Sequence, residues 1–293
     1  MSDEYHQLLD AAIQHLEGLK ARGVRFVPVQ PEHLAALAGA PRPVASRPAM
    51  ATAVAAAPKP SERAAPAGAL FSVPVEPVVV LPALSPEAKA AAFEDLRARA
   101  MVCVKCPNLA SSRKNVVFGV GSIDAELMFV GEAPGADEDE QGEPFVGKAG
   151  QLLTKIIQTM GLQRGQVYIG NILKCRPDTP GESAGNRKPT PAEMQTCIPY
   201  LHEQIDLIRP KVLVALGGTA VEGLLGKTVG ITKLRGQWQT YRNIPLMPTY
   251  HPAYLLRNQA LSEKRRVWED MLSVMEKLNM PISEKQRSFF LRA

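Results

Sequence analysis

The sequence predicts an α/β domain in which helices cover both faces of a parallel sheet. From residue 126 onward, short apolar segments typical of strands alternate with helical segments, which is the order of a parallel sheet with crossover helices. The strand segments are apolar at successive positions, as in VLVAL at 212–216, so both faces of the sheet should be covered. Ligands of such folds bind beyond the carboxyl ends of the strands, which locates the candidate site before any motif is considered.

Composition narrows the class of protein. The chain has 293 residues, of which 45% are apolar, so one or two domains with a sizeable core are expected. No apolar run approaches the roughly 18 to 20 residues of a membrane span, and the N-terminus lacks a signal-peptide pattern, so we expect a cytoplasmic protein with no membrane partner. The 34 basic and 29 acidic residues leave a net charge of +5, which permits a nucleic-acid partner but does not demand one.

The first 84 residues differ from the rest. Apolar residues recur at helical spacing over 4–21, so residues 1–23 are predicted to form an amphipathic helix that docks on the main domain, dimerises or recruits a protein partner. Residues 24–84 are expected to be a disordered linker, because six Pro and ten Ala fill 16 of the 28 positions from 41 to 68.

The main domain is predicted to span 85–280, followed by a C-terminal tail at 281–293. Its first helix begins with Ser85 as a cap and Pro86 at the first helical position, and Thr190 and Glu193 form a capping box for a later helix. The predicted helices are 85–100, 151–160, 190–208, 219–225 and 262–278, and the predicted strands are 126–131, 167–173, 212–216 and 244–250.

The first candidate loop follows the strand at 126–131. It is rich in glycine and acids, and it places Glu132 directly after the strand and Phe145 a short distance further along. It lacks the Gly-Lys-Ser/Thr ending of a phosphate-binding loop, and its carboxylates would repel phosphate. A carboxylate beside an aromatic face suits a small, flat, uncharged ligand, although a solvated acidic loop with a core phenylalanine has the same composition.

The second candidate loop follows the strand at 167–173. Asn171 lies near the strand end, where its amide can pair with the donor and acceptor edge of a ligand or simply form a turn. Arg176, Arg187 and Lys188 supply a basic patch suited to phosphates. The alternative is a solvated loop with scattered charge.

The third candidate loop begins with His251, directly after the strand at 244–250 and at the sheet edge predicted for the other two loops. A lone histidine is often structural, but this placement favours a functional role. Leu255 and Leu256, followed by Arg257, place apolar side chains and a cation on one protrusion. This segment either packs on the core or forms a wedge that enters a base stack.

All four cysteines lie in the main domain. Cys103 and Cys106 form a C-x2-C pair, and Cys175 and Cys197 bracket the basic loop with 21 residues between them. Without a secretion signal, this set indicates a metal or redox site rather than a disulfide scaffold. Zinc and an iron–sulfur cubane both accept four thiolates, and four unrelated core thiols remain an alternative.

Four motifs occur in a fixed order along the chain: GEAPGADEDEQGEPFVGKAGQLL from Gly131, NILKCRP from Asn171, NRKPTPAE from Asn186 and HPAYLLR from His251. No motif is specific by itself, but together they resemble the family-4 uracil-DNA glycosylases, the bacterial and archaeal type that carries an iron–sulfur cluster. The resemblance covers residues 100–277.

The resemblance implies a doubly wound, three-layer α/β/α domain with a four-stranded parallel sheet. It also implies an enzyme of base excision repair, which flips uracil out of DNA and hydrolyses its N-glycosidic bond. Cys103, Cys106, Cys175 and Cys197 would then hold a [4Fe-4S] cluster. The expected partner is single- or double-stranded DNA that contains uracil, and the expected state is a monomer associated with the nucleoid.

The resemblance further implies roles for individual residues. Phe145 stacks on the flipped uracil, and Asn171 pairs with its polar edge. Glu132 and His251 line the uracil pocket, and Asn186 lies near the scissile bond. The catalytic candidates are therefore Glu132, His251 and Asn186, with His251 as the hydrogen-bond donor to the departing base.

The DNA-binding candidates lie on the second and third loops. They are Arg176, Arg187, Lys188, Leu255, Leu256 and Arg257. Two features depart from the family pattern: the segment 179–185 lengthens the second loop ahead of Asn186, and the first 84 residues have no counterpart in a minimal member. A non-hydrolytic or covalent uracil-DNA-binding protein of the same fold is the alternative function, and a zinc-stabilised nucleic-acid-binding module is another.

Overall fold

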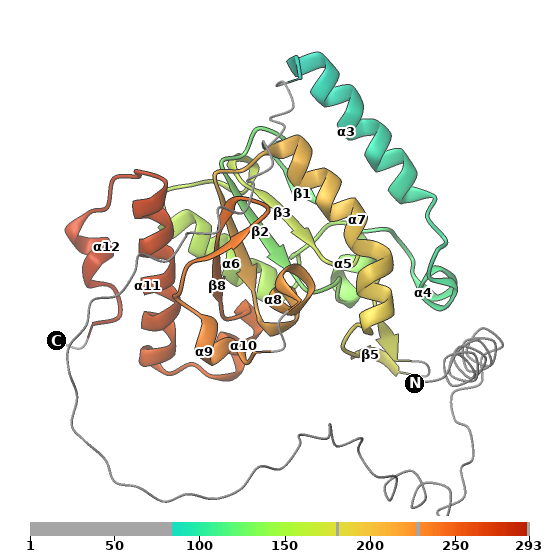
Figure 1. Ribbon diagram of the computed structural model, residues 1–293. Helices are drawn as coiled ribbons and strands as arrows, with labels where there is room; N and C mark the ends of the chain where they lie inside the picture. The colour runs from blue at the N-terminus through green and yellow to red at the C-terminus, as the bar shows by residue number, and fades with distance from the viewer. Residues whose placement is uncertain (1–83, 180–181, 227–228, 292–293) are drawn as a thin grey trace, which may run out of the picture. The chain divides into compact units, whose positions relative to one another are not determined.

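The computed structural model describes residues 84–179, 182–226 and 229–291 (Figure 1). The helix predicted over 1–23 and nearly all of the linker predicted over 24–84 lie outside these ranges. Within them, no helix combines the length and the apolarity that crossing a membrane requires.

The centre of the domain is a six-stranded sheet in the order β1-β3-β2-β6-β8-β7. The four central strands β3, β2, β6 and β8 are parallel, whereas the edge strands β1 and β7 run antiparallel to their neighbours. The bounds are β1 Val120–Gly121, β2 Leu127–Gly131, β3 Tyr168–Asn171, β6 Val212–Leu216, β7 Gln239–Tyr241 and β8 Ile244–Thr249. The expected count of four strands is therefore corrected to six, because the sequence pattern does not reveal the two short edge strands.

A separate two-stranded hairpin follows β3. It consists of β4 (Asp178–Thr179) and β5 (Glu182–Asn186), and it contains the segment that lengthens the second loop. The described helices are α3 Pro86–Met101, α4 Pro107–Ser112, α5 Ala136–Gln141, α6 Lys148–Thr159, α7 Pro191–Ile208, α8 Gly218–Leu225, α9 Ile231–Leu234, α10 Pro252–Arg257, α11 Leu261–Lys277 and α12 Glu284–Ser288, with a short 3-10 helix at Arg164–Gln166.

The two predicted helix caps are confirmed, whereas the helix predicted over 151–160 begins three residues earlier, at Lys148. The Ser85 hydroxyl accepts a hydrogen bond from the backbone N–H of Ala88 at 3.2 Å, which caps α3. Thr190 and Glu193 form the predicted capping box at the start of α7, with bonds of 3.2 and 2.8 Å. Each cap satisfies backbone donors that the first helical turn would otherwise leave unpaired.

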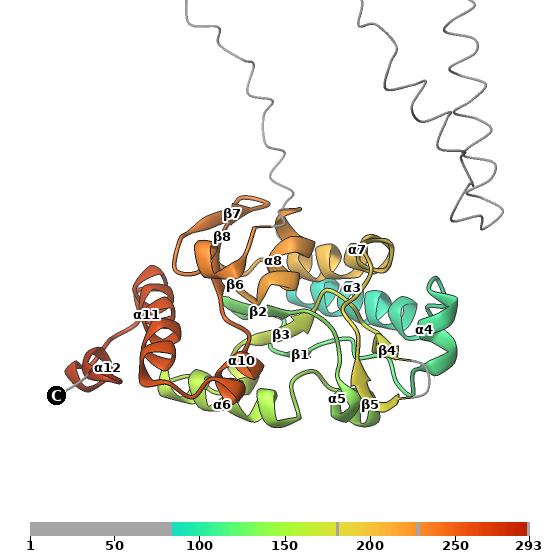
Figure 2. The same cartoon turned by 90° about the horizontal axis from the view of Figure 1, so that it is seen from below.

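Helices cover both faces of the sheet, so the three-layer α/β/α architecture is confirmed (Figure 2). On one face, Met128, Val130 and Leu213 pack in a cluster with apolar residues of α3, α7 and α8. On the other face, Phe129 and Val214 pack with residues of α6 and α11. Alternate residues of β2 therefore enter opposite cores, which explains why this strand is apolar at every position.

Candidate active site

The candidate site lies at the carboxyl edge of the central sheet. The strands β2, β3 and β8 are parallel, so the residues at their carboxyl ends meet at one edge. Gly131 pairs with Asn171 in register, which places Glu132 and Asn171 on neighbouring strand ends. His251 lies two residues after the end of β8 and caps α10.

Phe145 and His251 lie close together although 106 positions of sequence separate them. Their ring centroids are 5.5 Å apart, and the ring planes differ by 28°, so the two rings are stacked. Phe145 has a positive φ of 55°, an uncommon backbone conformation for a bulky residue. A conformation of this kind persists only where the surrounding structure holds it.

Gly131 is required by the close approach of two side chains. A Cβ atom at this position would lie 2.4 Å from Asn171 Oδ1 and 2.5 Å from Phe145 Cζ. Any larger residue would push the amide or the ring away. The glycine therefore brings an amide and an aromatic ring together at the end of β2.

Asn171 carries an unpaired buried oxygen. Its residue is 2% exposed, and its Oδ1 atom has no hydrogen-bond partner in the described part of the chain. Lys174 Nζ donates instead to the Asn171 backbone oxygen at 3.0 Å and to Gln204 Oε1 at 2.7 Å, which fixes the backbone here. Since an unpaired buried oxygen costs about 1–3 kcal/mol, its persistence indicates a ligand that donates a hydrogen bond to it.

His251 presents one ring nitrogen to the helix and keeps the other available. Its Nδ1 atom accepts a hydrogen bond from the backbone N–H of Ala253 at 3.1 Å. Burial, together with the positive charge of Arg257, lowers the pKa of His251 to about 4. The ring is therefore neutral at neutral pH and carries its proton on Nε2, where it can donate to a ligand oxygen.

We expect the His251 ring to stay neutral well below the usual histidine pKa. NMR titration of the ring resonances should show a midpoint near 4, because burial and Arg257 both disfavour the imidazolium. The chain has five histidines, and the spectrum of His251→Gln assigns the signal by its absence. A midpoint between 6 and 7 for that signal would contradict the neutral-donor geometry.

The end of β8 is held by a buried ion pair. Thr249 Oγ1 donates to Asp270 Oδ2 at 2.6 Å, and Arg235 pairs with the same carboxylate at 2.6 Å. Burial raises the pKa of Asp270 to about 6. These contacts fix the last residue of β8, two positions before His251, and so orient the third loop.

Glu132 is half-buried at the end of β2. Its backbone oxygen accepts a hydrogen bond from the Leu173 N–H at 3.1 Å, which links the first and second loops. Among the described residues, none forms a hydrogen bond or an ion pair with its carboxylate. The charge is therefore available to a ligand.

Two acids of the first loop have a structural role that sequence reasoning missed. Glu138 Oε1 accepts hydrogen bonds from the backbone N–H groups of Val146 and Gly147, each at 3.0 Å, and its Oε2 accepts from Gly135 at 3.0 Å. The buried Asp139 accepts from the backbone N–H of Lys114 at 3.0 Å. These carboxylates hold the loop that carries Phe145. A carboxylate three residues after the N-cap glycine was the available signal.

The lengthened second loop places Asn186 next to the first loop. Asn186 ends β5, and its Nδ2 atom lies 3.4 Å from the position that a Cβ of Gly135 would occupy. Arg176 Nε donates to Asn186 Oδ1 at 2.8 Å, which orients the amide. The extra segment thus forms a hairpin and leaves Asn186 beside the glycine-rich loop.

Two of the basic candidates are engaged in ion pairs. Arg187 binds both carboxylate oxygens of Glu193, at 2.8 and 2.6 Å, and thereby ties the second loop to the start of α7. Lys188 pairs with Glu222 at 2.6 Å but remains largely exposed. A surface ion pair of this kind is weak, so Lys188 can exchange Glu222 for a phosphate more readily than the chelated Arg187 can.

The two leucines of α10 occupy different environments. Leu255 is 5% exposed and packs with Tyr250 and Val267, whereas Leu256 is 39% exposed. Arg257 follows on the exposed surface. Leu256 is therefore the residue of this pair that can enter a base stack, and Leu255 anchors the helix.

The four cysteines come from three segments that meet beside α7. Cys175 and Cys197 are buried in the core cluster, and the half-buried Cys103 and Cys106 pack against it. Their mutual charge interactions raise the pKa of Cys106, after the larger effect of burial. Within the ranges that the structure describes, no three His, Cys, Asp or Glu side chains converge closely enough to hold a single metal ion.

Two of the sulfur atoms already accept hydrogen bonds. Arg113 Nη1 lies 3.1 Å from Cys175 Sγ, and the backbone N–H of Lys174 lies 3.2 Å from Cys197 Sγ. N–H···S bonds of this kind stabilise thiolate ligands and tune the clusters that they hold.

The chain is similar in sequence to known proteins. Residues 118–272 match the model of the uracil DNA glycosylase superfamily. A "Type-4 uracil-DNA glycosylase" of Thermotoga maritima is 45% identical over 61% of this chain and 91% of its own length. One of Sulfurisphaera tokodaii is 39% identical over 68% of this chain and 90% of its own length. A "Type-5 uracil-DNA glycosylase" of Pyrobaculum aerophilum is 29% identical over 56% of this chain and 83% of its own length.

Proposed function

Because this chain belongs to the uracil-DNA glycosylase superfamily, we propose that the pocket at the carboxyl edge of its sheet excises uracil from DNA. Water cleaves the N-glycosidic bond: its hydroxyl joins C1′ of the sugar, and its proton ends on N1 of uracil. The products are free uracil and an abasic site. The observation that carries this function is the unpaired buried Oδ1 of Asn171 beside the ring of Phe145.

The recognition step follows from these two side chains. Uracil presents an N3–H donor flanked by carbonyl acceptors, so the Asn171 amide can accept from N3–H and donate to O4. Cytosine reverses this pattern with an acceptor at N3 and an amino donor at C4, so an amide oriented for uracil would face it acceptor to acceptor and donor to donor. Phe145 supplies an apolar face on which the flipped base stacks.

The chemical step separates charge, and His251 acts on the departing base. As the glycosidic bond lengthens, negative charge develops on the uracil oxygens and positive charge on the sugar. The neutral His251 ring donates from Nε2 to that developing anion, since its Nδ1 accepts from the helix. A preorganised donor of this type contributes on the order of 2.7 to 4 kcal/mol.

Glu132 and Asn186 act on the sugar side. We place the Glu132 carboxylate near the developing cationic sugar, which a negative charge favours. Asn186, oriented by Arg176, lies near the scissile bond. The structure assigns the activation of water to neither residue.

The DNA strand crosses the surface formed by the second and third loops. Leu256 fills the gap left by the flipped base, and Arg257, Arg176 and Lys188 contact phosphates. Arg187 stays paired with Glu193 and supports the loop. The enzyme acts as a monomer on uracil-containing DNA in the cytoplasm, where it encounters the nucleoid.

The number of uracil equivalents released per protein chain distinguishes hydrolytic excision from uracil-DNA binding without hydrolysis and from covalent trapping. The first motif reads GEAPG, and no Lys/Arg-rich insertion precedes His251, in contrast to the covalent relatives. We expect the full chain to release several equivalents of free uracil from excess oligonucleotide. Release limited to one equivalent, with the protein attached to DNA, would establish the covalent alternative, and binding without release would establish the non-hydrolytic one.

The cysteine set fits a [4Fe-4S] cluster as a structural cofactor. The four thiols gather at one place without converging on a single-ion site, and a cubane takes thiolates from a wider circle than one zinc ion does. When bound, the cluster cross-links the segment after α3, the second loop and α7. This chain's Arg113 and Lys174 backbone N–H donate to the ligating sulfurs and hold the second loop in place.

Cys175→Ala should lose both the brown colour and the iron, about four atoms per chain in the parent protein. It should also unfold at a lower temperature, because three thiolates leave the second loop unanchored. Iron analysis and thermal unfolding measure these two effects. Thr196→Ala, one residue from Cys197 on α7, is the matched control and should keep the iron. Full iron content in Cys175→Ala would remove this residue from the ligand set.

A further inference from the structure

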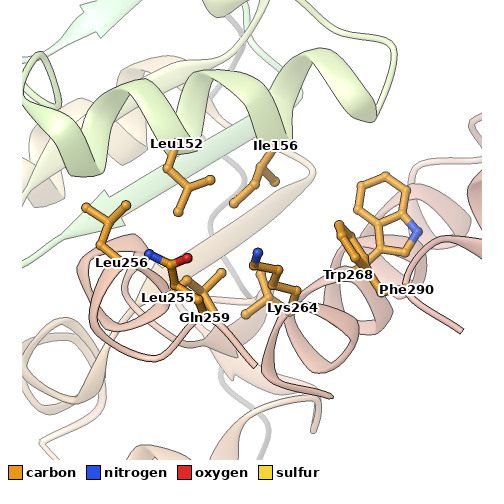
Figure 3. Close-up of a pocket in the computed structure, with 9 residues that line it drawn as sticks. Leu152, Ile156, Leu255, Leu256, Gln259, Lys264, Trp268 and Phe290 are labelled. Carbon is orange, nitrogen blue, oxygen red and sulfur yellow. The ribbon is translucent and has the colours of Figure 1, made fainter. Parts of the chain in front are cut away.

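An apolar groove lies near the proposed uracil site, and apart from the two leucines of α10 its lining residues have no role in the reaction described above. It has a volume of about 280 Å³ and runs between α6, α10 and α11 (Figure 3). Leu152 and Ile156 of α6 lie on one side, and Leu255 and Lys264 lie across from them (Figure 3). Val267 also lines the groove. Phe290 closes one end, with 42% of its surface exposed.

Two of the helices that line the groove begin next to residues of the proposed uracil site. The helix α6 begins three residues after Phe145, and α10 begins directly after His251, so both walls start at the uracil site. Leu152, at the near end of the groove, follows the start of α6 by four residues, which is about 6 Å of helix rise. Stacked nucleotides advance about 3.4 Å each along one strand. The near end of the groove is therefore about two nucleotides from the flipped uracil.

Positive charge without acidic partners surrounds the groove. Lys148 and Lys155 share the α6 face that carries Leu152, because they lie four positions before it and three after it. Lys264 lines the groove, and Arg257 follows Leu256 at the end of α10. Across the described ranges, these four cations form no ion pair with a carboxylate, and no acidic residue lines the groove.

The far end of the groove is fastened by two hydrogen bonds. Trp268, which lines it, donates from its indole Nε1 to the Gln286 backbone oxygen at 2.6 Å. Gln286 in turn donates to the Thr159 backbone oxygen at 2.8 Å, so the C-terminal segment is fastened to α6 and α11. The groove is thus a formed surface that needs little ordering before a ligand binds.

We propose that this groove binds the unstacked base of a flanking nucleotide, two or three positions from the uracil, while the surrounding cations hold the adjacent phosphates. The flat faces of nucleobases match an apolar groove, and the anionic phosphates that join them match its cationic rim. Base–aromatic contacts of this kind bind single strands without sequence preference. Phe290 supplies the aromatic face, and Lys264 holds a phosphate or the base edge. The inference rests on the proposed function, because it assumes that the strand crosses α10.

An abasic scan locates the subsite. The probe is a single-stranded oligonucleotide with non-hydrolysable 2′-fluoro-deoxyuridine, in which one flanking base at a time is removed. We expect affinity for the parent protein to fall by roughly tenfold when the base two or three positions away on one side is absent, and to change little elsewhere. Equal effects at every position would overturn the proposal.

Variants connect that position to the groove. In Phe290→Ala and Lys264→Glu, removing the flanking base two or three positions from the uracil should no longer weaken binding, because that base no longer contributes to binding in these variants. Lys264→Ala should also reduce the slope of log affinity against log salt by about 0.7. Leu291→Ala is exposed outside the groove, and Lys277→Glu lies at the other end of α11, roughly 20 Å away; both controls should behave like the parent.

A short substrate separates this inference from the proposed function. A uracil trinucleotide does not extend to the groove, so Lys264→Glu and the parent should release uracil from it at equal rates. If the parent releases no uracil from any substrate, the proposed function fails. If it does so normally but Lys264→Glu and Phe290→Ala retain the positional effect, the groove proposal alone fails.

Discussion

His251→Ala is expected to cut the single-turnover rate of uracil excision by about a hundredfold or more while leaving affinity for uracil-containing DNA nearly intact. The reason is that the Nε2–H donor meets a full partner only when charge has moved onto the departing base, and an interaction confined to the transition state changes rate rather than binding. Rapid-quench measurements at saturating enzyme give the rate, and a binding titration gives the affinity.

The role of His251 as the cap of α10 must be distinguished from its role as a hydrogen-bond donor to the departing base. His251 also accepts the Ala253 N–H, and losing an N-cap costs about 1 kcal/mol of stability. His251→Asn keeps a side-chain oxygen for the cap but cannot reach the base, so it should be as slow as His251→Ala. His202→Ala, a partly buried histidine beside Tyr241, should be as fast as the parent. Near-parent rates for His251→Ala would refute the mechanism even within the right family.

Asn171→Ala is expected to lower both the rate on uracil and the discrimination against cytosine, each by roughly 10- to 100-fold, because a bidentate base contact is worth about 1–3 kcal/mol. Unlike the histidine variant, this one should also bind uracil-containing DNA less tightly, since the amide pairs with the base before the bond breaks. Rates on matched uracil and cytosine oligonucleotides measure the effect.

The same substitution should leave the fold stable. Asn171 Oδ1 is unpaired in the protein without substrate, so removing it relieves a desolvation penalty that offsets the small cavity. We therefore expect thermal unfolding of Asn171→Ala within a few degrees of the parent. A large fall in unfolding temperature together with unchanged cytosine discrimination would show that the amide serves packing.

The central sheet and the long helices were predictable because their signals are local. The run VLVAL forms β6 at Val212–Leu216, as predicted, and the capping box at Thr190 starts α7. The parallel order then places residues 132, 171 and 251 at one edge, since they lie at or just after the carboxyl ends of three parallel strands.

The remaining features depend on contacts between distant segments. The edge strands β1 and β7 have two and three residues, too few to show a pattern. The spacing of Gly135 and Glu138 indicates only the capping contact between them. Nothing in the sequence shows that Glu138 also binds the backbone N–H groups beside Phe145, or that Arg187 pairs with Glu193. Leu255 is buried and Leu256 is exposed because of the way α10 packs against α11, which the sequence does not show.

The most direct test of uracil excision is strand cleavage at a defined position. The full-length protein is incubated with a labelled oligonucleotide that carries one uracil, and alkali then breaks the strand at any abasic site. A matched oligonucleotide with thymine in the same place is the control. The structure predicts a single break at the uracil and none at the thymine, and an intact uracil strand after incubation with the iron-loaded protein would contradict it.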